Sequence, residues 1–133
     1  MPRIMYKPRP DQNEYVIWST VVDLPVSGVL DRDTAKETWR AGACSILGTP
    51  ISAERAEESM QRADAKGWSL IDGEPGDYEL VHLANIDCYP GPYAFGVCRL
   101  ADLAPVTRAI EAGNWVTLHS LLTELTRYED GDE

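Results

Sequence analysis

Two histidines and two of the three cysteines carry the most recognisable chemistry in this chain of 133 residues. His82, Cys88, Cys98 and His119 could ligate zinc, or one thiol and one imidazole could act as nucleophile and base. Their spacing matches no zinc module, because zinc ligands come as short pairs of Cys or His. The cysteines also lack a glycine-rich elbow and, Arg99 apart, basic neighbours. We therefore predict no metal, no cofactor and no catalytic residue, while the sequence leaves open whether these groups approach one another.

Four tryptophans suggest an alternative, a small-molecule-binding or hydrolytic enzyme with a Trp-lined pocket. They are Trp18, Trp39, Trp68 and Trp115. They occupy apolar positions of predicted strands and helices, where tryptophan more often belongs to the core. The 22 Asp and Glu residues are too many for a close pair to be informative, and no glycine-rich phosphate-binding motif occurs.

The acidic residues are distributed unevenly. The formal net charge is −10, and residues 67–98 contain no Lys or Arg. The acidic residues of that stretch are Asp72, Glu74, Asp77, Glu79 and Asp87. Because nucleic-acid binding needs clustered cations, we predict no direct nucleic-acid contact. The stretch is a candidate protein-interaction surface, an interpretation that competes with simple solubility.

A rigid aromatic turn follows the acidic residues. Tyr89 and Tyr93 flank Pro-Gly-Pro, and aromatic side chains on a fixed loop lose little entropy when they dock against a partner. The two tyrosines either form such an anchor or fold back on the domain, and the sequence favours neither.

These residues must be positioned by an α+β domain. We predict a basic, proline-rich arm over residues 1–12, a single domain over 13–127 and an acidic tail over 128–133. Strands are predicted over 14–24, 68–71, 78–86 and 93–98, with a hairpin turn at 72–77. Helices are predicted over about 33–46, 53–65, 102–112 and 115–125. The fold class is therefore a small mixed or antiparallel sheet of three to four strands packed by about four helices.

Two elements carry predictions about packing. Residues 14–24 are apolar at both alternating positions, which predicts a strand that is central in its sheet or covered on both faces. The last helix has an apolar stripe that should pack on the sheet or on the first helix. Its members are Trp115, Leu118, Leu121, Leu122 and Leu125.

The sequence indicates a cytoplasmic protein. No apolar stretch approaches the roughly 20 residues that cross a bilayer. The basic N-terminus is not followed by an apolar stretch or a small-residue cleavage site. Three cysteines without a CxxC pair argue against a disulfide framework.

Two segments resemble small accessory proteins of actinobacterial phages. Residues 15–26 read YVIWSTVVDLPV and residues 62–69 read RADAKGWS. These phage proteins carry a similar YVxWSTVVDxP strand and an RADxxG helix end. The likeness covers about residues 14–69. It implies a phage or prophage setting and no catalytic residues, because the family has no assigned activity.

These observations favour a non-enzymatic accessory protein that binds and modulates a host protein, such as a defence, transcription or division component. A sharper version is DNA mimicry, in which carboxylates occupy the basic cleft of a nucleic-acid-binding host protein. The competing classes are the Trp-lined enzyme and a dimerising structural component. No membrane partner is expected, and the protein could be a monomer or a homodimer.

Overall fold

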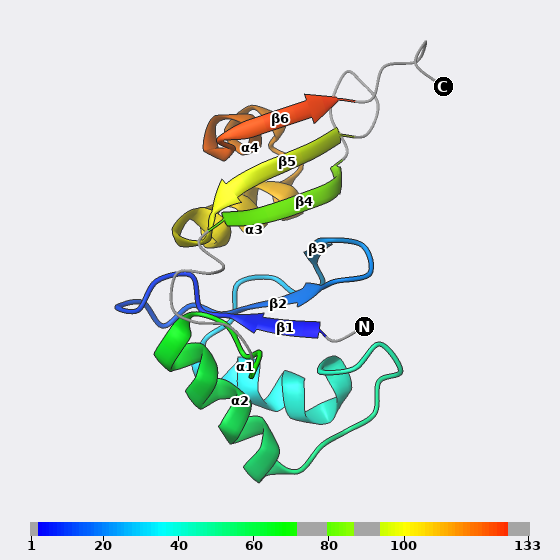
Figure 1. The fold of residues 1–133 in the computed structure, drawn as a ribbon, viewed down its shortest axis with the longest axis vertical. Helices are drawn as coiled ribbons and strands as arrows, with labels where there is room; N and C mark the ends of the chain where they lie inside the picture. Colours follow the sequence, from blue (N-terminus) through cyan, green and yellow to red (C-terminus); the bar gives the residue numbers. More distant parts are fainter. Residues whose placement is uncertain (1–2, 72–79, 87–93, 128–133) are drawn as a thin grey trace.

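The computed structural model describes residues 3–71, 80–86 and 94–127. Within these residues the chain forms two antiparallel three-stranded sheets and four α-helices. The predicted α+β class and its four helices are confirmed, but the strands divide between two sheets. Figure 1 shows the strands in the order β6-β5-β4 and then β3-β2-β1 along the long axis, with α1 and α2 beside β1.

The first sheet contains β1 (Arg3–Tyr6), β2 (Val16–Ser19) and β3 (Leu24–Pro25). Ile4 pairs with Trp18, and Trp18 pairs with Pro25. The prediction of an arm over residues 1–12 is wrong for β1, because Ile4, Met5 and Tyr6 are buried in the sheet. The three prolines that suggested an arm lie outside the strand, so its backbone donors remain free to pair.

The strand predicted over residues 14–24 is interrupted after Ser19. The Ser19 hydroxyl accepts hydrogen bonds from the backbone N–H groups of Val21 and Val22 at 3.2 and 3.4 Å. Asp23 then adopts a left-handed conformation with φ 54°, which reverses the chain into β3. The prediction that β2 is covered on both faces is confirmed, because Trp18 lies in one hydrophobic cluster and Ile17 in the other.

Two helical segments cover one face of this sheet. Helix α1 (Arg32–Thr38) is capped by Asp31 and continues into a wider helical turn, η1 (Trp39–Ala43). The predicted extension of this helix to Ile46 is wrong, because Gly42 has φ 134°, which is outside the helical range. Glycine is required at this position, since a Cβ would collide with the Gly48 carbonyl. Helix α2 (Ala53–Lys66) matches its prediction, with Ser52 at its N-cap and Gly67 in the left-handed conformation at its end.

The second sheet contains β4 (Leu80–Ile86), β5 (Ala94–Arg99) and β6 (Glu124–Arg127). The predicted hairpin between residues 68–71 and 78–86 is wrong, because β4 pairs with β5. Trp68 instead forms a bridge with Tyr6 of the first sheet. Aromatic and β-branched residues identify a strand locally, but they do not specify its partner.

Helices α3 (Leu103–Ala112) and α4 (Trp115–Leu121) follow the short turn η2 (Leu100–Asp102). The Asn114 side chain caps α4 as predicted, but the helix ends at Leu121 and not near Leu125. Thr123 donates its N–H and hydroxyl to the Val97 carbonyl at 2.7 and 3.1 Å. These contacts direct the chain into β6 (Glu124–Arg127). The first residues of β6 had been predicted to belong to the helix, because Leu125 continues its apolar stripe.

One hydrophobic core connects the two sheets. It includes Trp18 of β2, Leu83 of β4, Leu103 of α3 and Leu118 of α4. The remaining apolar residues of the predicted α4 stripe pack against this core, as expected. A backbone hydrogen bond of 3.2 Å from the Ala84 N–H to the Asp23 carbonyl adds a link between the sheets.

Candidate functional site

The seven residues predicted to form an interaction surface lie outside the described residues. They are Asp72, Glu74, Asp77, Glu79, Asp87, Tyr89 and Tyr93. Cys88 and the tail at 128–133 also lie outside them. In the sequence, four of these residues lie in the segment before β4, and the other three lie between β4 and β5. The second sheet is therefore a described element to which both segments connect.

The candidate Cys–His pair does not form between Cys98 and His82. His82 is exposed on β4 opposite Val97, whereas Cys98 is buried opposite Val81 on the other face of the sheet. Burial, followed by the negative charge of Asp102, raises the pKa of the Cys98 thiol to about 12. The thiol is therefore protonated and unreactive at neutral pH. His119 lies in the last turn of α4.

No grouping of three or more His, Cys, Asp or Glu side chains suited to a metal ion occurs in residues 3–71, 80–86 and 94–127. This statement does not extend to Cys88.

The outer face of the second sheet, away from the helices, exposes apolar side chains. Leu80 is 51% exposed and Phe95 is 43% exposed, whereas Val81 and Leu83 on the opposite face are 2% and 1% exposed. This contrast follows from the alternation of side chains along a strand. The outer face is defined here by Leu80, His82, Ala84, Phe95, Val97, Arg99 and Glu124. In it Leu80 pairs with Arg99, His82 with Val97 and Val97 with Glu124.

A hollow of about 320 Å³ lies over this outer face. Phe95 and Val97 give it apolar walls, and Asp23, Glu124 and His82 also line it. Asp23 is held there by its left-handed backbone and by the bond from Ala84. The arrangement combines apolar surface with two carboxylates, which suits the stem and the charge of a Lys or Arg side chain.

Sequence analysis did not identify Asp23, Phe95 or Glu124 as site residues. Alternation within residues 93–98 could have placed Phe95 and Val97 on one face. The approach of Asp23 and Glu124 could not have been found this way, because it depends on the turn after β2 and on the unexpected strand β6.

A second polar cluster connects α1, α2 and the first sheet. The Arg32 guanidinium donates to both Glu57 oxygens at 3.1 and 2.9 Å and to Asp64 at 3.0 Å. Asp64 also accepts a hydrogen bond from the Tyr15 hydroxyl and lies 3.5 Å from the Lys7 ammonium. The cluster joins four segments that are distant in sequence, so its function is to hold the fold together.

The same cluster changes the acidity of its members. Burial, followed by the hydrogen bond to Asp64, raises the pKa of Tyr15. For Asp64, burial opposes the charged form, but the hydrogen bonds from Tyr15 and Arg32 outweigh it and lower the pKa. Arg32, and then Lys36, lower the pKa of Glu57 to about 2.

Protonation of Glu57 should account for part of the fall in the free energy of unfolding at low pH. Its pKa is lower in the folded state than the ordinary 4.5, so its contribution is complete above about pH 4.5 and is lost as the pH falls toward 2. The carboxylate is 31% exposed, which limits the contribution to about 1 kcal/mol. Urea unfolding at several pH values should show that Glu57→Gln has a shallower acid dependence than the natural chain. Equal dependences would contradict this assignment.

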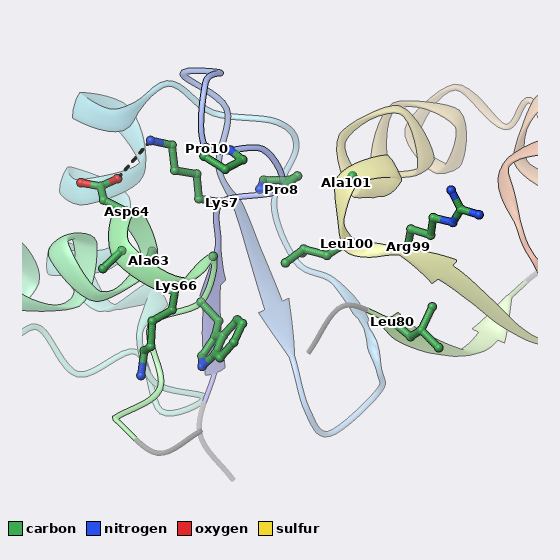
Figure 2. A pocket seen from close by; sticks show the side chains of 13 residues that line it. Lys7, Pro8, Pro10, Ala63, Asp64, Lys66, Leu80, Arg99, Leu100 and Ala101 are labelled. Atoms are coloured by element: carbon green, nitrogen blue, oxygen red, sulfur yellow. Dashed lines mark ion pairs between the residues drawn. The ribbon is translucent and has the colours of Figure 1, made fainter. Parts of the chain in front are cut away.

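A pocket of about 470 Å³ lies between α2 and the start of η2. Figure 2 shows Lys7 reaching Asp64, while Lys66 and Arg99 extend away from each other on opposite sides of Leu100. The Lys66 ammonium bonds the Leu70 and Ile71 carbonyls at 2.6 and 3.1 Å. Trp68 borders the pocket but is only 1% exposed. The volume suits a small ligand, but the polar groups do not converge on one.

Comparisons with protein-family models, curated proteins and solved structures gave no match. Among the described residues, no helix combines the length and the apolar character needed to cross a membrane. Functional inference therefore depends on the geometry of the chain itself.

Proposed function

We propose that this chain is a non-enzymatic binding protein that recognises a basic surface of a partner protein. The outer face of the second sheet carries the proposal, because it places exposed Phe95 in one hollow with Asp23 and Glu124, and exposed Leu80 lies farther along the same face. The resemblance to actinobacterial phage accessory proteins suggests that the partner is a host protein. Binding would then modulate that host protein without any chemical step.

The chemistry of the outer face specifies the partner. A Lys or Arg side chain would lay its methylene groups on Phe95 and Val97 and place its charge near Asp23 and Glu124. The net charge of −10 would steer such a partner toward the protein and make association sensitive to salt. The acidic residues beside β4 and β5 in the sequence add to the same attraction.

The competing structural function has less support. A dimer formed through the apolar stripe of α4 would need that stripe at the surface. Instead, Leu118 is buried and Trp115, Leu121, Leu122 and Leu125 pack against the core of the same chain. The outer face of the second sheet is the better candidate for an interface.

Phe95→Glu should weaken partner binding about tenfold or more, because it places a charge within the apolar part of the interface. The full chain is immobilised, an actinobacterial lysate is passed over it, and the retained protein is identified, purified and titrated against the variant. Val116→Glu is the matched control, because Val116 is 83% exposed on α4 and lies outside the outer face. It should bind like the natural chain.

A double variant tests whether partner binding requires the negative charges of Asp23 and Glu124. Asp23→Asn with Glu124→Gln should weaken binding and flatten its salt dependence, and asparagine tolerates the left-handed backbone at position 23. Asp11→Asn with Glu54→Gln removes the same charge elsewhere on the surface. Failure to recover a stoichiometric basic partner, or equal affinity for the Phe95 and Val116 variants, would contradict the proposal. Competition by duplex DNA for the partner would support the mimicry version.

A further inference from the structure

A second cleft, of about 600 Å³, lies on the side of α2 that faces the loop after η1. Three arginines line it: Arg3 from β1, and Arg55 and Arg62 from α2. Among the described residues that line the cleft, Glu58 is the only acidic one. The described lining therefore has a formal excess of two positive charges in a protein whose net charge is −10.

These arginines differ from six of the other described cations, whereas Lys66 and Arg99 likewise form no ion pair with a described carboxylate. Lys7, Arg9, Arg32, Lys36, Arg40 and Arg108 each form an ion pair with a carboxylate. Within residues 3–71, 80–86 and 94–127, no carboxylate lies within ion-pair distance of Arg3, Arg55 or Arg62. The positive charge of this cleft is thus not neutralised by neighbouring described side chains.

The cleft also borders hydrogen-bond donors without acceptors. Among the described residues, the indole Nε1 of Trp39 and the Nε of Arg3 are buried and have no hydrogen-bond partner. Trp39 is 5% exposed and lines the cleft. Buried donors are normally paired, and leaving one unpaired is costly. Both atoms are closed to solvent, so acceptor oxygens of a ligand would reach them only after a small shift of the cleft wall on binding.

The walls of the cleft are held in place before any ligand binds. The Arg62 Nε donates to the Ser69 carbonyl at 2.6 Å, and its Nη2 donates to the Ser59 hydroxyl at 3.2 Å. The Arg3 Nη1 donates to the Ala43 carbonyl at 3.3 Å. Preorganised donors bind an anion without first losing side-chain freedom.

We propose that this cleft binds the phosphate group of a small organic phosphomonoester. A dianionic phosphate balances the excess of two positive charges on the described lining. The exposed Arg55 guanidinium can match two phosphate oxygens in paired hydrogen bonds. Arg3 and Arg62 add positive charge and the N–H groups that they do not already donate to Ala43, Ser59 and Ser69. Pro50, Ile51 and Leu70 supply apolar lining for the organic part. The volume falls within the usual range for small-molecule sites. The cleft is separate from the outer face of the second sheet, so this function is additional to partner binding.

The test uses phenyl phosphate as the probe, which combines a dianionic head with an apolar ring. The ¹⁵N-labelled full chain is titrated, and the indole N–H signal of Trp39 is followed after assignment by through-bond experiments. We expect a saturable shift with phenyl phosphate and weaker binding of both inorganic phosphate and benzoate. Inorganic phosphate lacks the apolar part, and benzoate carries only a single charge.

Arg55→Gln should weaken phenyl phosphate binding roughly tenfold, because it removes one charged donor set. Arg55 is exposed, so this change should leave the fold intact. Arg99→Gln on β5 removes the same charge outside the cleft and should change the affinity less than about twofold. Absence of a saturable Trp39 shift, or equal weakening by the two variants, would overturn the proposal. Equal affinity for benzoate would overturn its phosphate specificity.

Discussion

Leu103→Ala should lower the free energy of unfolding by about 2–5 kcal/mol while the protein still unfolds in one transition. Leu103 begins α3 and is fully buried in the core that contains Trp18 of the first sheet and Leu83 of the second. Alanine would leave a cavity between the sheets, because close-packed neighbours relax only partially. If the two sheets fold as one unit, both lose stability together.

Urea unfolding followed by tryptophan fluorescence and by far-ultraviolet circular dichroism distinguishes these outcomes. Trp18, Trp39 and Trp68 report on the surroundings of the first sheet, and Trp115 reports on α4. Circular dichroism reports on all helices and strands. Coincident transitions would support one cooperative unit. Separate transitions, or a loss confined to one signal, would show that the sheets unfold independently. Val116→Ala is the control, because this residue is 83% exposed, and its effect should stay within about 0.5 kcal/mol.

The features predicted correctly from the sequence are those that local chemistry determines. Helix α2 is the clearest example: Ser52 accepts the Arg55 N–H, and Gly67 takes the left-handed conformation that ends the helix. Both residues act within one turn of their own position. The Asn114 cap of α4 follows the same logic. Such signals can be recognised without knowing what the helix packs against.

The incorrect predictions concern pairing between distant segments. Arg3–Tyr6 has no local sign of a strand beyond its apolar residues, and its ladder depends on β2, ten or more residues later. The residues of β6 continue the apolar spacing of α4, but Thr123 bonds Val97 and the chain joins β5. In both places tertiary pairing overrides local pattern.

The two candidate sites also differ in whether local sequence or tertiary packing reveals them. The acidic segment was visible in the sequence because charge is a property of composition. The cleft of Arg3, Arg55 and Arg62 was not visible, because the predicted arm over residues 1–12 gave Arg3 no place beside the helix over 53–65. Only their packing brings these charges to one place.

Asp64→Ala should destabilise the fold by about 2 kcal/mol, although the residue belongs to neither binding site. The substitution removes the acceptor of the Tyr15 hydroxyl and of the Arg32 Nε, and it removes the carboxylate beside Lys7. Tyr15 is 1% exposed, so its hydroxyl would lose its partner in a largely buried position. The Asp64 carboxylate is 31% exposed, which keeps the expected loss below that of a fully buried pair.

A double-mutant cycle with Tyr15→Phe isolates the hydrogen bond within this loss. Tyr15→Phe alone should cost about 1 kcal/mol, and the double variant should lose less than the sum of the two single variants, because they share one interaction. The hydrogen bonds lower the pKa of Asp64, so its contribution is present above its ordinary pKa and is lost as the pH falls below that value. The natural chain and Asp64→Ala should therefore converge in stability in acid. Strict additivity, or a difference independent of pH, would show that Asp64 acts through packing and not through its charge.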